Sequence, residues 1–573
     1  MKENYRNGER AMAFAKLTTA RGENLPATPW EAYPRPQLKR NSYVNLNGTW
    51  DFAVSPDGAF PAAYDQKILV PFCPESQLSG IEAHFSEGIS LFYRKTLIFP
   101  EGFRKDRVLL HIGAADQRAE VYVNQTLVGS HVGGYNAFTV DITGALGEEN
   151  ELVIRVTDDL RDKTLPHGKQ SLTRGGMWYT PVSGIWQSVW LESVPVSYVN
   201  QIDIQTTLTQ AVITVTPALN GVVILEGKEY PLVDGKALVS PENPKLWTPD
   251  EPHLYAFTLA AGEDRIESYF ALRTLETKVV DGYPRLCLNG KPYFFHGLLD
   301  QGYWPDGIYT PADPKCFDDD ILAMKALGFN MLRKHIKVEP EHFYHACDRL
   351  GMVVFQDMVN NDGYEFFRDT IAPTFLGQKK DDRAMHPNPE SRAAFLKAME
   401  ETVAQLKNHP CICCWTIFNE AWGQFDSSAC YEKLKALDGS RFIDSTSGWF
   451  RGSASDVESL HIYFGLWHRM RPSEKPLVLS EFGGFTYSTP DHIFNPDKSY
   501  GYGGCKTTEA LSQRIAETYR KHVIPAIEKG LCASVYTQVS DVEDEINGLL
   551  TYDRKLCKPD QEIMLALARD LKI

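Results

Sequence analysis

Short runs of alternating apolar and polar side chains fill residues 45–193. In the run ELVIRVTD, the apolar residues Leu152, Ile154 and Val156 recur at every second position, and the polar residues Arg155 and Thr157 fall on the other face. Side chains two residues apart in a strand lie on the same face, so each predicted strand has one apolar and one polar face. This pattern is typical of antiparallel strands in a β-sandwich. We therefore predict a first β-sandwich domain over residues 1–195.

A second and smaller β segment follows. Runs such as AVITVTP and YAFTLAA have the strand length and spacing of a short sandwich, and they lie between residues 196 and 275. Their arrangement favours an immunoglobulin-like β-sandwich as the second domain.

From about residue 276 the pattern changes to strands that alternate with helices. Eight apolar strands are expected: YFFHGLL, NMLRKHI, VVFQDM, CICCWTIFNE, RFIDSTSG, SLHIYFG, PLVLSEFGG and CASVYTQVSD. A helix is expected before the fourth, because Leu396, Met399, Val403 and Leu406 recur at steps of three and four. Eight strands alternating with helices are typical of a (β/α)8 TIM barrel, which we assign to residues 276–573.

Two glutamates stand at the ends of predicted barrel strands. Glu420 closes the strand CICCWTIFNE, and Glu481 lies near the end of PLVLSEFGG. The carboxyl ends of the strands surround the mouth of such a barrel, where its chemistry takes place. A carboxylate pair at this mouth suits glycoside hydrolysis, in which one group donates a proton and the other attacks or stabilises the sugar carbon. The alternative is structural: Glu420 caps the following helix, and Glu481 pairs with Arg333.

Composition narrows the possible partners. The chain of 573 residues carries 59 basic and 74 acidic side chains, a formal net charge of -15, so its field would repel a phosphate backbone and we expect no nucleic-acid partner. No segment approaches the ~20 apolar residues of a membrane span, and the N-terminus lacks the apolar core of a signal peptide. We therefore expect no membrane association and predict a cytoplasmic protein.

The 11 cysteines fit the same compartment. They are odd in number and lie mostly within apolar runs such as CICC, which favours reduced, buried thiols. A metal site at Cys411, Cys413 and Cys414 is disfavoured, because alternate strand residues point to opposite faces.

Several motifs together resemble glycoside hydrolase family 2, the β-galactosidase and β-glucuronidase group. In the barrel these are TIFNEAWG, VLSEFGG, LNGKPYFFHGLLDQGYWPDG, MKALGFNMLRKHI and ACDRLGMVVFQDM, and before it NLNGTWDF, SGIWQSVWLE and PKLWTPDEPHLY. The resemblance extends from about residue 40 to the C-terminus. It implies a jelly-roll β-sandwich of the sugar-binding type, an immunoglobulin-like sandwich and a catalytic TIM barrel.

The resemblance also implies roles for individual residues. Glu420 matches the acid/base and Glu481 the nucleophile, so that the enzyme would retain anomeric configuration. Asn419 is expected to bind the sugar 2-hydroxyl, Tyr463 to orient the nucleophile, and Arg333 to lower its pKa from beneath. The alternative for Tyr463 is a core aromatic. Further candidates for substrate binding are Asp300, Lys334, His335, Trp304, Trp467, Lys498 and Tyr536.

Two departures from the family bear on cofactor and substrate. Metal-dependent β-galactosidases carry a Glu and a His after strand three, whereas FQDMVNNDG supplies neither, so we expect no cofactor and no catalytic metal. Typical β-glucuronidases hold the sugar carboxylate with an Asn-x-Lys element. Here Leu549 stands where that lysine should follow Asn547, so the usual carboxylate clamp is missing.

The basic loop RKHIK offers other cations. Arg333, Lys334 and Lys337 are expected near the mouth, and Lys498 lies in a loop after the nucleophile strand. A lysine is able to receive a substrate carboxylate as a point charge. The alternative is a solvated basic turn that pairs with Glu339 and Glu341.

These observations predict a retaining exo-β-glycosidase that acts on terminal galactose-configured sugars, either β-galactosides or β-galacturonides. The alternatives are a β-glucuronidase with a different carboxylate clamp and, from another class, a carbohydrate-binding relative without activity. Both glutamates and Asn419 are present, which argues against the binding protein, because such a protein needs no second carboxylate. We expect a glycoside as the substrate and a homo-oligomer as the assembly.

Overall fold

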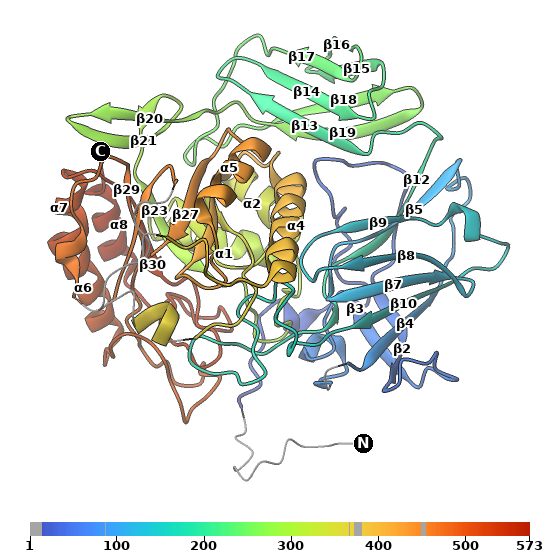
Figure 1. The fold of residues 1–573 in the computed structure, drawn as a ribbon, viewed down its shortest axis with the longest axis horizontal. Coiled ribbons are helices and arrows are strands. Elements are labelled where there is room, and N and C mark those ends of the chain that lie inside the picture. Colours follow the sequence, from blue (N-terminus) through green and yellow to red (C-terminus); the bar gives the residue numbers. More distant parts are fainter. Residues whose placement is uncertain (1–13, 86–87, 366, 372–380, 449–453, 464) are drawn as a thin grey trace.

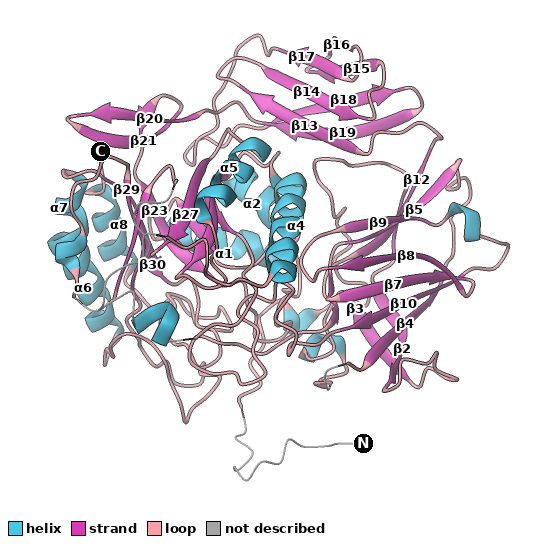
Figure 2. Cartoon of the chain, in the orientation of Figure 1, coloured by secondary structure: helices cyan, strands magenta, loops and turns pink. Residues whose placement is uncertain are grey.

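A computed structural model describes residues 14–85, 88–365, 367–371, 381–448, 454–463 and 465–573. Figure 1 shows three parts: a β-sandwich formed by the first third of the chain, a smaller sandwich packed at one end, and a barrel surrounded by helices. Figure 2 shows that the longer helices gather around the barrel, whereas the other two parts consist mainly of strands. The predicted fold class is confirmed.

The first sandwich has two main antiparallel sheets. Their orders are β1-β12-β5-β9 and β3-β2-β4-β10-β7-β8, with a small β11-β6 pair beside them. The strands are β1 (Tyr43–Asn45), β2 (Gly48–Ser55), β3 (Gln66–Val70), β4 (Ser90–Thr96), β5 (Arg107–Ile112), β6 (Ala115–Asp116), β7 (Arg118–Val123), β8 (Thr126–Val132), β9 (Phe138–Asp141), β10 (Glu151–Thr157), β11 (Gly184–Ile185) and β12 (Val189–Val194).

The second sandwich has sheets of three and four antiparallel strands, ordered β13-β14-β17 and β16-β15-β18-β19. In β14 buried residues alternate with more exposed ones, as the sequence pattern predicts. The strands are β13 (Gln201–Thr206), β14 (Ala211–Thr216), β15 (Gly221–Leu225), β16 (Lys228–Leu232), β17 (Lys236–Val239), β18 (Tyr255–Ala261) and β19 (Asp264–Phe270). The boundaries that we assign to the domains remain predictions.

The eight expected barrel strands form one parallel sheet, ordered β27-β26-β25-β24-β23-β30-β29-β28. Every residue of β26 is buried, because the strand is covered on both faces, and this explains its continuous apolar sequence. Ser447 and Ser459 Oγ atoms, 3.3 Å apart, join the two outer strands. The strands are β23 (Phe295–Asp300), β24 (Met331–Lys334), β25 (Val353–Asp357), β26 (Ile412–Asn419), β27 (Phe442–Ser447), β28 (Glu458–Ile462), β29 (Leu477–Gly483) and β30 (Leu531–Thr537).

A three-stranded antiparallel sheet, β20 (Leu275–Val280), β21 (Tyr283–Leu288) and β22 (Lys291–Pro292), precedes the barrel. The helix expected before the fourth strand is α4 (Pro389–Leu406), whose start is fixed by Asn388, since its side chain accepts from the Glu390 amide. The other helices are α1 (Lys315–Ala326), α2 (Glu341–Leu350), α5 (Ser427–Leu437), α6 (Thr508–Thr518), α7 (Ile524–Ile527) and α8 (Gln561–Arg569). Single turns are η1 (Gly22–Asn24), η2 (Gln77–Ser79), η3 (Thr143–Ala145), η4 (Phe367–Ile371), η5 (Trp467–Arg469) and η6 (Tyr519–Val523).

A segment of the first sandwich, residues 165–183 between β10 and β11, packs on the barrel. We call it the docking segment. Arg174 donates to Glu543 and Asp544 at 2.9 and 3.3 Å, and the Tyr179 hydroxyl donates to Glu545. Since Glu543 to Glu545 follow β30, the sandwich reaches the carboxyl end of the barrel strands.

Two structural findings concern the helices and the cysteines. Among the helices of the described residues, none combines the length and apolar character that crossing a bilayer requires. All 11 cysteines are free thiols, and Cys411, Cys413 and Cys414 are buried in the apolar core.

Candidate active site

Glu420 stands in a tight turn directly after β26. Its amide donates to the Ser447 carbonyl at 3.0 Å, and the Trp422 amide donates to the Asn419 carbonyl at 3.0 Å. Glu420 and Ala421 have φ angles of 49° and 61°, in the left-handed region that residues with a Cβ rarely adopt. Such backbone strain is frequent at functional sites. Glu420 does not cap α5, as one interpretation of the sequence held; its Oε1 instead lies 2.8 Å from His461 Nδ1.

Glu481 lies in β29, two residues before the strand ends, and is buried. Its Oε1 accepts from Arg333 Nη1 at 3.1 Å and its Oε2 from the Tyr463 hydroxyl at 2.7 Å. Burial alone raises the pKa of Glu481, but the charges of His461 and Arg333 outweigh burial and lower that pKa to about 2. Glu481 is therefore an ionised carboxylate with both oxygens oriented by neighbours.

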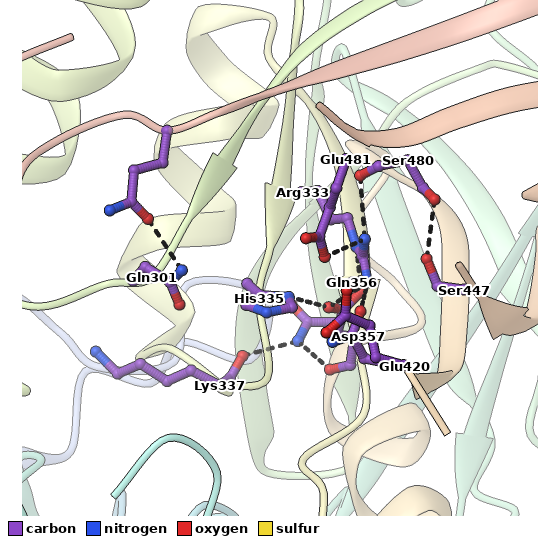
Figure 3. A network of polar contacts seen from close by, with 12 residues as sticks. Gln301, Arg333, His335, Lys337, Gln356, Asp357, Glu420, Ser447, Ser480 and Glu481 are labelled. Atoms are coloured by element: carbon purple, nitrogen blue, oxygen red, sulfur yellow. Dashed lines mark hydrogen bonds and ion pairs between the residues drawn. The ribbon is translucent and has the colours of Figure 1, made fainter. Parts of the chain in front are cut away.

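Arg333 organises the base of the site, as Figure 3 shows. Its Nε and Nη2 donate to the two carboxylate oxygens of Asp357 at 2.9 and 3.0 Å, a bidentate pair that fixes the guanidinium. Its Nη2 also donates to Asn419 Oδ1 at 2.9 Å. His335 Nδ1 lies 2.7 Å from Asp357 Oδ2. Arg333 thus joins the nucleophile candidate Glu481 to Asn419, beside Glu420.

His461 lies between the two glutamates, and our sequence interpretation missed it. Besides its contact with Glu420, its Nε2 lies 3.5 Å from Glu481 Oε1 and 3.0 Å from Ser447 Oγ. A signal was present: His461 precedes Tyr463 by two positions in the strand SLHIYFG, so both side chains should point the same way. Asp357, the last residue of β25, was missed as well.

Glu420, His461 and Glu481 offer ligand atoms that all lie within 4.8 Å of one another, a group able to hold a metal ion. Our sequence interpretation considered only the residues after the third strand, whereas this cluster is formed by residues at the ends of the fourth, sixth and seventh strands. However, the positive guanidinium of Arg333 already contacts Glu481 and opposes a cation there. The absence of a catalytic metal therefore stays a prediction.

We expect chelation to leave activity unchanged, because the charge of Arg333 occupies the position where a cation would neutralise Glu481. We would measure kcat/KM on a glycoside that the wild type cleaves, first before and after dialysis against EDTA, and then after magnesium is added back. A loss on dialysis that magnesium restores would assign a metal to the cluster.

Two lysines expected at the mouth are internal. Lys334 Nζ donates to Asp300 Oδ2 at 2.6 Å and to Glu339 Oε1 at 2.9 Å, and its side chain is 1% exposed. Lys337 Nζ donates to Glu339 Oε1 at 3.0 Å and to the Gly302 carbonyl at 2.6 Å. The expectation that Lys334 or Lys337 receives a substrate carboxylate is corrected, because burial and pairing leave no free ammonium. Asp300 is likewise a partner of Lys334.

Replacing Lys334 by methionine should lower the free energy of unfolding by about 3–5 kcal/mol, because two buried carboxylates lose their shared cation. Urea unfolding followed by tryptophan fluorescence measures the change. The matched control is Lys498→Met on an exposed lysine, expected within about 0.5 kcal/mol of wild type. Equal unfolding midpoints for both variants would contradict the importance of this ionic network.

The aromatic candidates divide into packing and surface roles. Trp304 is buried with the Arg554 guanidinium 4.1 Å over its ring, and Tyr536 is buried against Phe482. Trp467 is half-buried and stacks on His522 of the helical layer at 4.2 Å. These packing contacts do not test a role in substrate binding, which stays a prediction for the three rings. The Tyr463 hydroxyl does contact Glu481, and Tyr502 stacks on the Tyr463 ring at 4.0 Å.

Asn547 and Leu549 occupy the positions where the Asn-x-Lys element was sought in the sequence. Leu549 is buried, so no cation stands at the position of the usual clamp. Asn547 is buried and donates to Glu545 Oε1 at 2.9 Å. Lys498 is exposed, and its Nζ would lie 3.2 Å from a Cβ added at Gly175, so it rests against the docking segment.

Comparisons with known proteins agree on one family. A model described as glycosyl hydrolases family 2, TIM barrel domain, matches residues 279–500. The chain is 24% identical over 469 residues to β-glucuronidase of Homo sapiens, with 69% of each chain covered. It is 25% identical over 463 residues to β-galactosidase of Thermoanaerobacter pseudethanolicus, covering 72% of this chain and 58% of that one.

Solved structures share the fold. A β-glucuronidase from an uncultured Clostridium superposes with a TM-score of 0.72 at 19% identity, covering 93% of this chain and 99% of that chain. A family 2 β-galacturonidase from Eisenbergiella tayi, bound to galacturonate, gives a TM-score of 0.67 at 19% identity, covering 94% and 99%.

Proposed function

Because the chain belongs to glycoside hydrolase family 2, we propose that it is a retaining exo-β-glycosidase that removes terminal β-linked galactose-configured sugars, as β-galactosides or β-galacturonides. Glu481 acts as the nucleophile and Glu420 as the acid and base. The reaction is a double displacement through a covalent glycosyl-enzyme.

The different environments of the two glutamates carry this proposal. Glu481 is held ionised by Arg333 and Tyr463, as a nucleophile must be. The Glu420 side chain is 15% exposed, against 6% for Glu481, so it is open to a leaving group and to water. Oxygens of the two carboxylates within 4.8 Å of each other suit the separation of about 5–5.5 Å typical of retaining enzymes.

The steps follow from these positions. A Glu481 oxygen attacks the anomeric carbon while Glu420 gives its proton to the glycosidic oxygen, and the carbon–oxygen bond to the aglycone breaks. Glu420 then takes a proton from water, the resulting hydroxide attacks the same carbon, and Glu481 leaves as carboxylate. In this proposal Asn419, whose Oδ1 accepts from Arg333 Nη2 at 2.9 Å, binds the sugar 2-hydroxyl as charge develops.

The glycone is the less constrained part of the proposal. The named relatives include β-glucuronidases, a β-galactosidase and β-galacturonidases. Leu549, in place of the lysine of the usual clamp, argues against the usual mode of glucuronide binding. The alternative is a β-glucuronidase that holds the carboxylate elsewhere, and the number of relatives of that name favours it.

The test is hydrolysis of nitrophenyl β-galactoside, β-galacturonide, β-glucuronide, β-mannoside and α-arabinoside, with proton NMR of the first sugar product. We expect cleavage of the galactoside or galacturonide and release of the β-anomer. Release of the α-anomer would contradict the double displacement. Cleavage of the glucuronide alone would overturn the choice of sugar, and no turnover at all would support a binding protein.

A further inference from the structure

The docking segment of the first sandwich reaches the barrel mouth next to the candidate nucleophile's supports. The His167 and Gly168 amides donate to the Asn360 carbonyl at 3.1 and 3.2 Å, and Asn360 follows β25 by three residues. Gly168 has a φ angle of 58°, and a Cβ there would lie 2.9 Å from the Ile336 carbonyl oxygen. The segment is therefore fixed against the carboxyl ends of β24 and β25.

Lys169 is the next residue along this fixed backbone. Its carbonyl accepts from the Tyr179 amide at 3.1 Å, and the residue is half-buried. Its Nζ lies 5.7 Å from the centre of the Trp178 ring. Trp178 packs edge-on against Trp422 at 5.1 Å, and Trp422 follows Glu420 by two residues. Two successive ring contacts thus connect Lys169 to the turn that carries Glu420.

The ammonium group of Lys169 differs from the other cations around the mouth. Arg333, Lys334, Lys337 and Arg174 all donate to carboxylates of the protein. No hydrogen bond or ion pair to Lys169 Nζ occurs within the described residues. A half-buried ammonium group that donates to no protein carboxylate within the described residues is available to an anionic ligand, which would offset the cost of its partial burial.

Glu545 is an acidic side chain on which the charge of Lys169 acts: burial raises the pKa of Glu545, and Lys169 opposes that rise. Glu545 already accepts from the Tyr179 hydroxyl at one oxygen and from Asn547 at the other. The charge of Lys169 also acts on His335, which is buried in the site. Burial lowers the pKa of His335, and among the charges that act on it Lys169 lowers that pKa further. Lys169 therefore lies close enough to His335 and Glu545 for its charge to act on both.

We propose that Lys169 binds the C6 carboxylate of the substrate, so that the glycone is a hexuronic acid rather than a neutral hexose. This inference rests on the proposed glycosidase function and narrows it to uronides. A lysine on the sandwich, instead of a lysine after the last barrel strand, would then supply the charge that Leu549 lacks. Galacturonide and glucuronide share this carboxylate, and the experiment separates them.

The experiment compares wild type with Lys169→Met, which keeps the length and packing of the side chain. Substrates are the nitrophenyl β-galacturonide and β-glucuronide, each paired with its neutral counterpart, β-galactoside or β-glucoside. We expect wild type to prefer one uronide over its counterpart, and Lys169→Met to lower kcat/KM on that uronide about 100-fold. The change on the neutral counterpart should stay below about threefold. Lys498→Met tests the competing lysine identified from the sequence. Lys506→Met, an exposed lysine outside the candidate site, is the control and should leave both unchanged.

Several outcomes would overturn the inference while the glycosidase function stands. These are a wild type that cleaves only neutral glycosides, an equal loss on both members of a pair, and a loss with Lys498→Met in place of Lys169→Met. If wild type cleaves nothing, the proposed function fails, and calorimetric binding of galacturonate, glucuronate and galactose decides the inference. Uronate binding that Lys169→Met removes would support it, and no preference for uronate would overturn it.

Discussion

Glu481→Ala is expected to abolish turnover, lowering kcat by about 10⁴-fold or more, because the variant has no group to attack the anomeric carbon. The fold should persist, since Arg333 keeps its bidentate pair with Asp357. Initial rates on a nitrophenyl substrate that wild type cleaves measure the loss. Near-ultraviolet circular dichroism reports the fold.

Two further measurements separate chemistry from structure in this variant. Azide is small enough to enter the space of the missing carboxylate, so added azide should restore cleavage and give the α-glycosyl azide. Tyr463→Phe, which removes one hydrogen bond to Glu481 but not the nucleophile, should lose far less activity. Near-normal turnover by Glu481→Ala would remove the nucleophile assignment.

Glu420→Ala is expected to lower kcat/KM by about 10²–10⁴-fold on glycosides with poor leaving groups, which need a proton in the first step. Dinitrophenolate leaves without needing that proton, so the rate of the first step should fall little on a dinitrophenyl glycoside. The second step stays slow, and glycosyl-enzyme should accumulate. Stopped-flow absorbance would then record a burst of dinitrophenol. Added azide should release this intermediate as the β-glycosyl azide.

The control for Glu420 is Glu517→Ala, an exposed glutamate of α6, which should leave the rate on both substrates unchanged. The dependence on leaving group is the decisive result. A Glu420→Ala variant that loses equally on both substrates, without a burst, would contradict the acid/base role.

The barrel was predictable because its strands are buried on both faces. Runs such as CICCWTIFNE are almost wholly apolar until the strand reaches the mouth. The positions of Glu420, Glu481 and Arg333 in the fold could be read from this pattern. The small sheet β20–β22 before the barrel was not predicted as a separate element, because buried and exposed residues do not alternate regularly in β20.

The burial of charged residues could not be predicted in the same way. A stretch such as RKHIK reads as a basic turn, yet Lys334 and Lys337 are internal because Asp300 and Glu339 meet them from other segments. His461 and Asp357 depend likewise on partners far away in the sequence. Lys169 lies in a different domain from the glutamates, and sequence spacing carries no information on such a contact.

The three consecutive acidic residues Glu543, Asp544 and Glu545 have a consequence for how this protein can change over time. Each is bonded to the docking segment, through Arg174, Tyr179 or the Thr180 amide, and all three are buried. If recombination joined this barrel to a foreign sandwich, the three buried carboxylates would lose their partners. The loss would lower the free energy of unfolding by several kcal/mol. The first sandwich and the barrel should therefore be inherited together, with this interface as the barrier to exchange.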